Sequence, residues 1–282
     1  MRRAPDPLAR RSPALVRLVA PILTRHVRHS FHALRVARPG PPALPTGRPV
    51  LIYCNHPAWW DPAVLAVLAT RLFPDRISAG PIDADALARY GLLGRVGLFP
   101  IRPGTAGGAA AFLRAGTALL ARSDTLLWVT AEGRFSDPRH RPLALRPGVA
   151  ALLRRHPHAL AVPLALEYPF WTERLPEALV RFGDPVDTAA AGAAEDPRLL
   201  STRLAAGLAA TMDRLAGDAI AKDPAAFDVL LAGRVGVGGV YDVWRRVRAW
   251  AAGRRFSAAH GPERAVPGRP PVPPGRRAGE AP

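Results

Sequence analysis

The fold is predicted outward from one segment, Tyr53-Cys54-Asn55-His56-Pro57-Ala58-Trp59-Trp60-Asp61-Pro62. The run Val50-Leu51-Ile52-Tyr53 is continuously apolar and is typical of a buried strand. Residues 63–68 are apolar as well and predict a helix, because Asp61 suits an N-cap and Pro62 suits the first turn. The stretch therefore predicts a tight strand-to-helix connection that carries a histidine and, five residues later, a carboxylate.

Two interpretations of this His–Asp spacing are open. If residues 57–60 turn back, Asp61 can accept a hydrogen bond from one imidazole nitrogen of His56, and the other nitrogen is left as a general base. In the second interpretation, Asp61 only caps the helix and His56 is a turn residue. The spacing alone favours the second interpretation, and the rest of the chain reverses that preference.

Strand-like and helix-like segments alternate along the chain after this stretch. Strands are predicted at 77–82, 98–101, 125–129, 160–166 and 179–182, and helices at 84–90, 107–122, 149–155 and 200–215. This alternation predicts a single α/β domain with a central parallel or mixed sheet flanked by helices. Ligand sites in such sheets gather at strand ends, where we expect the functional residues to meet.

The composition limits the partners of the chain. A net charge of +17 over 282 residues implies an anionic partner: nucleic acid, acidic lipid or a phosphorylated substrate. No nucleic-acid recognition motif is present and the arginines are scattered, so we expect no nucleic-acid partner. The single cysteine excludes an internal disulfide and a cysteine-rich zinc site. His26, His29 and His32 alternate with arginines that would repel a cation, so we expect no metal.

The two ends of the chain differ from its centre. Residues 1–36 form a basic amphipathic segment that predicts either a membrane-surface element or a helix packed on the protein's own core, kinked or split at Pro21. Residues 37–222 are assigned to the α/β domain, and residues 223–256 to a basic, aromatic helix with the same two interpretations. Residues 257–282 are rich in Pro, Gly and Arg and are predicted to be disordered. No apolar run is long enough for a transmembrane helix, and Arg17 interrupts the run that resembles a signal peptide.

Four blocks of sequence resemble, in order, those of the plsC-like glycerophosphate/lysophosphatidate acyltransferase family. The first is Asn55-His56-x4-Asp61, and the second is Gly97-Leu98-Phe99-Pro100-Ile101-Arg102. The third, Thr130-Ala131-Glu132-Gly133-Arg134-Phe135-Ser136, is similar to the family's Phe-Pro-Glu-Gly-Thr box but lacks its Phe-Pro and has Arg134 in place of Thr. The fourth is Val162-Pro163-Leu164-Ala165-Leu166, and the resemblance as a whole covers roughly residues 35–215.

The resemblance implies a role for each matching residue. His56 would be the general base and Asp61 would orient it, in a fold like that of glycerol-3-phosphate acyltransferase. The remaining residues would contact substrates: Asn55, Arg102, Glu132, Gly133 and Arg134 would bind the acceptor, and Trp59, Trp60 and Pro163 would wall the pocket. Arginine suits an acceptor phosphate because its planar fork matches the phosphate oxygens.

The resemblance also implies a reaction. An acyl group would pass from acyl-CoA or acyl-carrier protein, as co-substrate and without a cofactor, to the hydroxyl of a lysophospholipid, by default 1-acylglycerol-3-phosphate. We expect a peripheral protein on the cytoplasmic face of the cell membrane, in contact with anionic lipids. Three alternatives stay open: an acceptor without phosphate, a non-catalytic anionic-lipid-binding protein, and a covalent scheme through Cys54, which we expect to be buried at the end of its strand.

Overall fold

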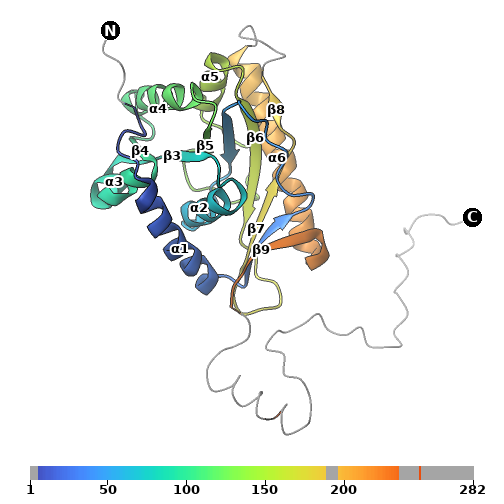
Figure 1. The fold of residues 1–282 in the computed structure, drawn as a ribbon. Helices are drawn as coiled ribbons and strands as arrows, with labels where there is room; N and C mark the ends of the chain where they lie inside the picture. The colour runs from blue at the N-terminus through green and yellow to red at the C-terminus, as the bar shows by residue number, and fades with distance from the viewer. Residues whose placement is uncertain (1–5, 189–195, 235–247, 249–282) are drawn as a thin grey trace, which may run out of the picture. The chain divides into compact units, whose positions relative to one another are not determined.

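The computed structural model of this chain describes residues 6–188, 196–234 and 248. The helices and strands discussed below all belong to one compact unit, Met1–Trp171 with Leu175–Arg234, and a second unit holds Thr172–Arg174 and the residues from Val235 onward. The first unit is an α/β domain built on a mixed sheet, as the sequence predicts (Figure 1).

The strands of the sheet lie in the order β4-β3-β5-β2-β6-β7-β1-β9, and a short strand, β8, pairs with β6. Their bounds are β1 Ala33–Ala37, β2 Val50–Cys54, β3 Ile77–Asp83, β4 Leu98–Ile101, β5 Thr125–Thr130, β6 Leu160–Glu167, β7 Glu177–Phe182, β8 Val186–Asp187 and β9 Phe227–Ala232. The five strands from β4 to β6 are mutually parallel, whereas β7 is antiparallel to β6 and β9 is antiparallel to β1. The carboxyl ends of β4, β3, β5, β2 and β6 therefore lie along one edge of the sheet.

β2 lies at the centre of the parallel part, between β5 and β6. All five of its residues are buried, because helices cover both faces of the sheet at this point. A strand covered on both faces has no solvent-facing side, which explains why Val50–Cys54 is continuously apolar instead of alternating. The residues that follow β2 are thus held at a rigid position.

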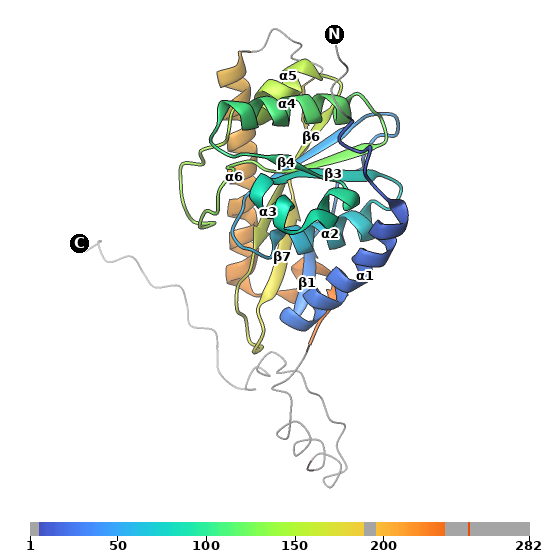
Figure 2. The same ribbon diagram turned by 90° about the vertical axis from the view of Figure 1, so that its left-hand side faces the viewer.

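Helices form one layer on each side of the sheet (Figures 1 and 2). One layer contains α4 (Ala106–Leu120), α5 (Gly148–Arg155) and α6 (Pro197–Ala221), and its side chains pack with Leu51 and Tyr53 of β2. The other layer contains α1 (Pro13–Ser30) and α2 (Asp61–Leu72), which pack with Ile52 and Cys54. The remaining helical segments are α3 Ala84–Arg89, η1 Gly91–Val96 and η2 Pro224–Ala226.

The N-terminal segment differs from its prediction where its helix ends. α1 ends at Ser30, and Ala33–Ala37 form a fully buried strand between β7 and β9, so the boundary proposed at residue 36 falls inside the sheet. Phe31 and Leu34 continue the helical spacing of α1 in the sequence, but both are buried in the core. α1 is also one helix that contains Pro21, so the proline does not split it.

The predicted C-terminal boundary is also wrong. Residues 227–232, which were assigned to a basic helix, form β9 and pair with β1, because Phe227 and Leu231 are buried against the core. The α/β domain therefore extends to β9 rather than ending at residue 222. The part of the predicted helix beyond Arg234 and the predicted disordered tail lie outside the described residues, apart from Arg248.

Candidate active site

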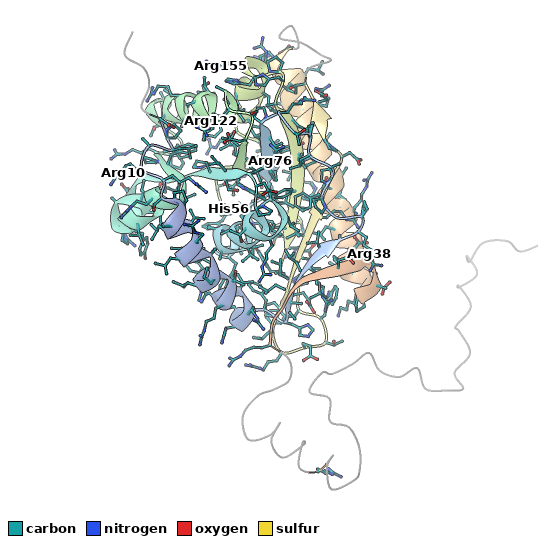
Figure 3. The ribbon with its side chains drawn as sticks, viewed as in Figure 1. Arg10, Arg38, His56, Arg76, Arg122 and Arg155 are labelled. Atoms are coloured by element: carbon teal, nitrogen blue, oxygen red, sulfur yellow. The ribbon has the colours of Figure 1, made fainter. Side chains whose placement is uncertain are left out.

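The first, third and fourth sequence blocks meet at the carboxyl edge of the parallel strands. His56 follows β2, the Glu132 loop follows β5, and Tyr168 follows β6. The loops contact one another directly, since the Ala131 amide donates to the Cys54 carbonyl over 2.8 Å and the Ser136 amide donates to the His56 carbonyl over 3.0 Å. Figure 3 shows His56 beside α2.

The His56 and Asp61 side chains are in direct contact. Nδ1 of His56 lies 2.5 Å from Oδ2 of Asp61, because residues 58–61 form a turn closed by a hydrogen bond from the Asp61 amide to the Ala58 carbonyl. Asp61 is fully buried, whereas the His56 side chain retains 17% of its exposure. The carboxylate fixes Nδ1 as the hydrogen-bonding nitrogen, so Nε2 is the atom left for a substrate proton.

The Asp61 carboxylate does not cap α2, although its position in the sequence suits an N-cap. Trp60 occupies the N-cap and makes no side-chain capping bond. Oδ2 of Asp61 accepts from His56 and from the Ala58 amide, and Oδ1 accepts from the Tyr168 hydroxyl over 2.7 Å. Burial and the Asp61 charge together raise the pKa of Tyr168, so this hydroxyl stays protonated and can donate. Of the two interpretations of the His–Asp spacing, the geometry supports the catalytic one.

Asn55 is buried and holds the His56 loop against β6. Its Nδ2 donates to the Leu166 carbonyl, and its Oδ1 accepts from the Leu166 amide, both over 2.9 Å. The side chain is 0% exposed. The structure therefore gives Asn55 a positioning role in place of the substrate contact predicted for it.

The loop after β5 provides three features of the site. Phe135 lies on the His56 imidazole with ring centroids 4.1 Å apart, and its side chain is largely exposed. Glu132 is 2% exposed, and neither of its carboxylate oxygens has a hydrogen-bond partner among the described residues. Gly133 has a φ of +63°, which L-residues rarely adopt. A buried carboxylate without donors is uncommon in folded proteins, and it marks Glu132 as a group that a ligand could satisfy.

Arg102 and Arg134 are both exposed near this edge of the sheet. Arg102 directly follows β4, the outermost parallel strand, and Arg134 follows Gly133 in the loop after β5. Neither guanidinium forms an ion pair within the part of the chain that the structure describes. Both are therefore available to an anionic group of a substrate.

The predicted pocket-wall residues lie in three different surroundings. Pro163 is buried in β6, where its carbonyl accepts from the Gly183 amide, and thus belongs to the sheet core rather than to a pocket wall. The Trp60 ring packs against His26 and Phe31 at centroid distances of 4.9 and 5.2 Å, so it joins α2 to the α1 segment. Trp59 is 71% exposed and touches Trp60 edge to face.

Cys54 is fully buried at the end of β2. Burial and the nearby Asp61 carboxylate both raise the pKa of its thiol, so the reactive thiolate is disfavoured. A covalent scheme through Cys54 is inconsistent with this position. Among the described residues, no three His, Cys, Asp or Glu side chains form a group that could hold a metal ion.

Sequence reasoning missed Tyr168 and Phe135. Tyr168 comes two residues after Leu166, the residue that pairs with Asn55, and nothing in the sequence spacing connects it with Asp61. Phe135 lies in the third block and had no distinguishing feature in the sequence. The chemistry that these residues support is general-base activation of a hydroxyl by an imidazole that a buried carboxylate holds in place.

Part of the sequence also matches a known protein family. Residues 35–167 match the sequence profile of the Acyltransferase family, a range that includes His56, Asp61, Arg102 and Glu132 and ends one residue before Tyr168. This segment therefore resembles an acyltransferase domain, the class of protein that the four blocks predict.

Solved structures include similar chains, eight in all. One is the 1-acyl-sn-glycerophosphate (LPA) acyltransferase PlsC from Thermotoga maritima, with a TM-score of 0.49 and 11% sequence identity over 71% of this chain and 79% of that one. No curated protein sequence matches the chain.

Proposed function

We propose that this protein transfers a fatty acyl group from acyl-CoA or acyl-carrier protein to the hydroxyl of a lysophospholipid at a membrane surface. The default acceptor is 1-acylglycerol-3-phosphate. The observation that carries the proposal is the His56–Asp61 contact, with the carboxylate fully buried and the imidazole partly open to solvent. The Acyltransferase family match over residues 35–167 supports the reaction type.

In the proposed reaction, Nε2 of His56 takes the proton of the acceptor hydroxyl while its oxygen attacks the thioester carbonyl. The C–S bond then breaks, and the proton on His56 passes to the leaving thiolate. Asp61 orients the imidazole through Nδ1 and stabilises the imidazolium while the proton is held. Attack is direct, so no acyl-enzyme forms.

Glu132, Arg102 and Arg134 are the proposed acceptor contacts. The unpartnered carboxylate of Glu132 suits a hydroxyl donor, and the two exposed arginines suit a phosphate. Gly133 keeps the loop backbone in the conformation that presents Glu132. These roles are carried over from the family's third and second blocks.

The membrane part of the proposal rests on α1. Its inner face packs on the core through Val27 and Leu23, while Leu18 and Ile22 are 63% and 60% exposed. Exposed apolar and basic residues on one helix are typical of binding at a lipid interface. Within the described residues, no helix is long and apolar enough to cross a membrane. We therefore propose peripheral binding, at the cytoplasmic face where the thioester donors would be supplied.

Acyl transfer by the purified protein on lipid vesicles tests the proposal. Long-chain acyl-CoA and acyl-carrier protein would be offered with a panel of lysophospholipids and non-phosphate hydroxylated amphiphiles, and products would be identified by mass. A lysophosphatidate product that disappears in His56→Ala is the expected result. Transfer only to a non-phosphate acceptor would support the proposed mechanism but show that the acceptor is not a lysophospholipid. Vesicle binding without turnover for any pair would instead favour a non-catalytic lipid-binding protein.

A further inference from the structure

An open groove of about 670 Å³ lies away from the His56 loop, along α1. α1 lines it with Ala20, Pro21, Thr24, Arg25, Arg28 and His29, α2 contributes Thr70 and Arg71 from its last turn, and Gly233 and Arg234 follow β9. None of the residues assigned above to the site lines it. The groove is therefore a second concave surface of the domain.

The groove is strongly cationic. Four of its ten lining residues are arginines from three segments that lie far apart in the sequence, and none of the ten is acidic. Arg25, Arg71 and Arg234 form no ion pair with any described carboxylate, and Arg28 donates from Nε to the Ala232 carbonyl over 3.2 Å. Like charges gathered in this way repel one another, so an anionic ligand would stabilise the arrangement.

Backbone contacts hold the two sides of the groove together. The Gly233 amide donates to the His32 carbonyl over 2.8 Å, and the Arg234 amide donates to the Phe31 carbonyl over 3.2 Å. A Cβ atom at Gly233 would lie 2.0 Å from the Phe31 carbonyl oxygen, so this close approach requires glycine. The end of β9 is thus fixed against the end of α1, and the arginines extend from a rigid frame.

Exposed apolar side chains border the arginines on the same helix. Leu18 and Ile22 lie seven and three residues before Arg25 along α1, about two turns and one turn away, and remain 63% and 60% exposed. In a bilayer surface, phosphate headgroups lie directly above acyl chains. Arginines next to apolar side chains on one helix could therefore contact headgroups and acyl chains at the same time. A small soluble phosphate compound would leave these apolar residues in water.

We propose that the groove between α1, the end of α2 and the residues after β9 binds the phosphate headgroup of an anionic phospholipid in a bilayer, separately from the His56 site. The proposal deepens the proposed function and rests on its membrane-surface part. Arg25, Arg71 and Arg234 contact the headgroup phosphate, and Leu18 and Ile22 enter the acyl layer. The protein is thereby oriented on anionic membranes by a defined site as well as by its overall positive charge.

Vesicle binding by two matched triple variants of the full chain tests the proposal. The groove variant is Arg25→Gln, Arg71→Gln and Arg234→Gln, and the control is Arg114→Gln, Arg155→Gln and Arg198→Gln. The control arginines are exposed on α4, α5 and α6, the layer on the other side of the sheet; Figure 3 shows Arg155 on α5. Both variants lose three charges, so a difference between them reports position rather than net charge. Binding is measured at one salt concentration on phosphatidylcholine vesicles with and without phosphatidylglycerol.

The groove variant is expected to lose roughly tenfold or more in affinity for vesicles with phosphatidylglycerol, and the control much less. A lysine triple at the groove positions is expected to bind more tightly than the glutamine triple, which ties the loss to charge and not to misfolding. Equal weakening in groove and control variants, or equal losses in the lysine and glutamine triples, would overturn the proposal.

Competition with soluble phosphates distinguishes the source of the ligand. Inorganic phosphate and coenzyme A are not expected to displace the protein from vesicles at constant ionic strength. Displacement by coenzyme A that the groove variant abolishes would assign the groove to the soluble donor and overturn the lipid proposal. Because this experiment measures vesicle binding, its result does not depend on turnover. If the wild-type protein showed no acyl transfer and the groove variant still lost vesicle binding, the lipid site would stand and the proposed reaction would be wrong.

Discussion

Tyr168 donates its hydroxyl proton to Oδ1 of Asp61 over 2.7 Å, on the same carboxylate whose Oδ2 holds His56. The two residues come from different parallel strands, since Asp61 follows β2 and Tyr168 follows β6. Both carboxylate oxygens of Asp61 thus accept hydrogen bonds, which restricts rotation of the carboxylate. The carboxylate in turn holds the His56 imidazole in one orientation. Tyr168 is a positioning residue for the proposed general base.

Tyr168→Phe is expected to lower turnover roughly tenfold, because one hydrogen bond to a buried charged group is lost, an effect of about 1–3 kcal/mol. The loss should fall mainly on kcat and much less on KM for the acceptor, because Tyr168 acts through Asp61 on the general base. A Tyr168→Phe protein that unfolds more easily but keeps the wild-type kcat would contradict this positioning role.

Asn55→Ala is expected to lower the free energy of unfolding by about 2–4 kcal/mol, because it leaves the buried Leu166 amide and carbonyl without their partner. Denaturant unfolding of the purified variant measures this loss. Thr202→Ala is the control: its hydroxyl bonds only the Arg198 carbonyl on the surface of α6, so a change within about 0.5 kcal/mol is expected. Equal effects at the two positions would contradict the role given to Asn55.

Gly133→Ala is expected to destabilise the loop after β5 by about 1–2 kcal/mol, because its φ of +63° is unfavourable for alanine and the new Cβ would lie 3.2 Å from Cγ of Arg146. Turnover should fall as well, since Glu132 precedes this residue. Gly217→Ala, at an exposed position near the C-terminal end of α6, meets no atom within 4 Å and should stabilise the protein by about 0.5–1 kcal/mol. Thermal unfolding of both variants is the measurement.

The Cys54 thiol is expected to resist alkylation by iodoacetamide at pH 8 in the native protein and to react after unfolding. Its burial and the Asp61 charge both raise its pKa, so the native thiol remains protonated and inaccessible. Cys54→Ala should retain acyl transfer. Loss of transfer in a folded Cys54→Ala protein, together with a trapped acyl-thioester, would instead support the covalent scheme.

The sequence predicted the parts of the fold that are encoded locally. β4 was predicted with its observed bounds, and the strand before His56 was evident because a strand covered on both faces is apolar throughout. β1 was mistaken for the end of a helix because Val27, Phe31 and Leu34 happen to follow helical spacing. β9 was missed because Phe227 and Leu231, its buried residues, are four apart, which is also helical spacing. Pairing with strands that are distant in the sequence makes both segments strands instead of helices.

The candidate site was predicted to a similar extent. The His56–Asp61 pair follows from the first block, since its partners are five residues apart and one turn brings them together. Tyr168 could not be found from spacing, because it lies 107 residues from Asp61 and meets it only through the pairing of β2 with β6. The burial of Asn55 and Pro163 likewise depends on neighbouring strands, so their predicted substrate contacts were misplaced.

Acyl transfer to lysophosphatidate by the wild-type protein, His56→Ala and Asp61→Asn, with folding checked by circular dichroism, directly measures the role of His56. His56→Ala is expected to lower turnover by roughly 100-fold to 10,000-fold, because the general base is lost. Asp61→Asn is also expected to lower it strongly, because the imidazole loses its orientation. Vesicle binding should be unchanged in both. Turnover by a folded His56→Ala protein within about twofold of wild type would contradict the assignment of His56 as the general base.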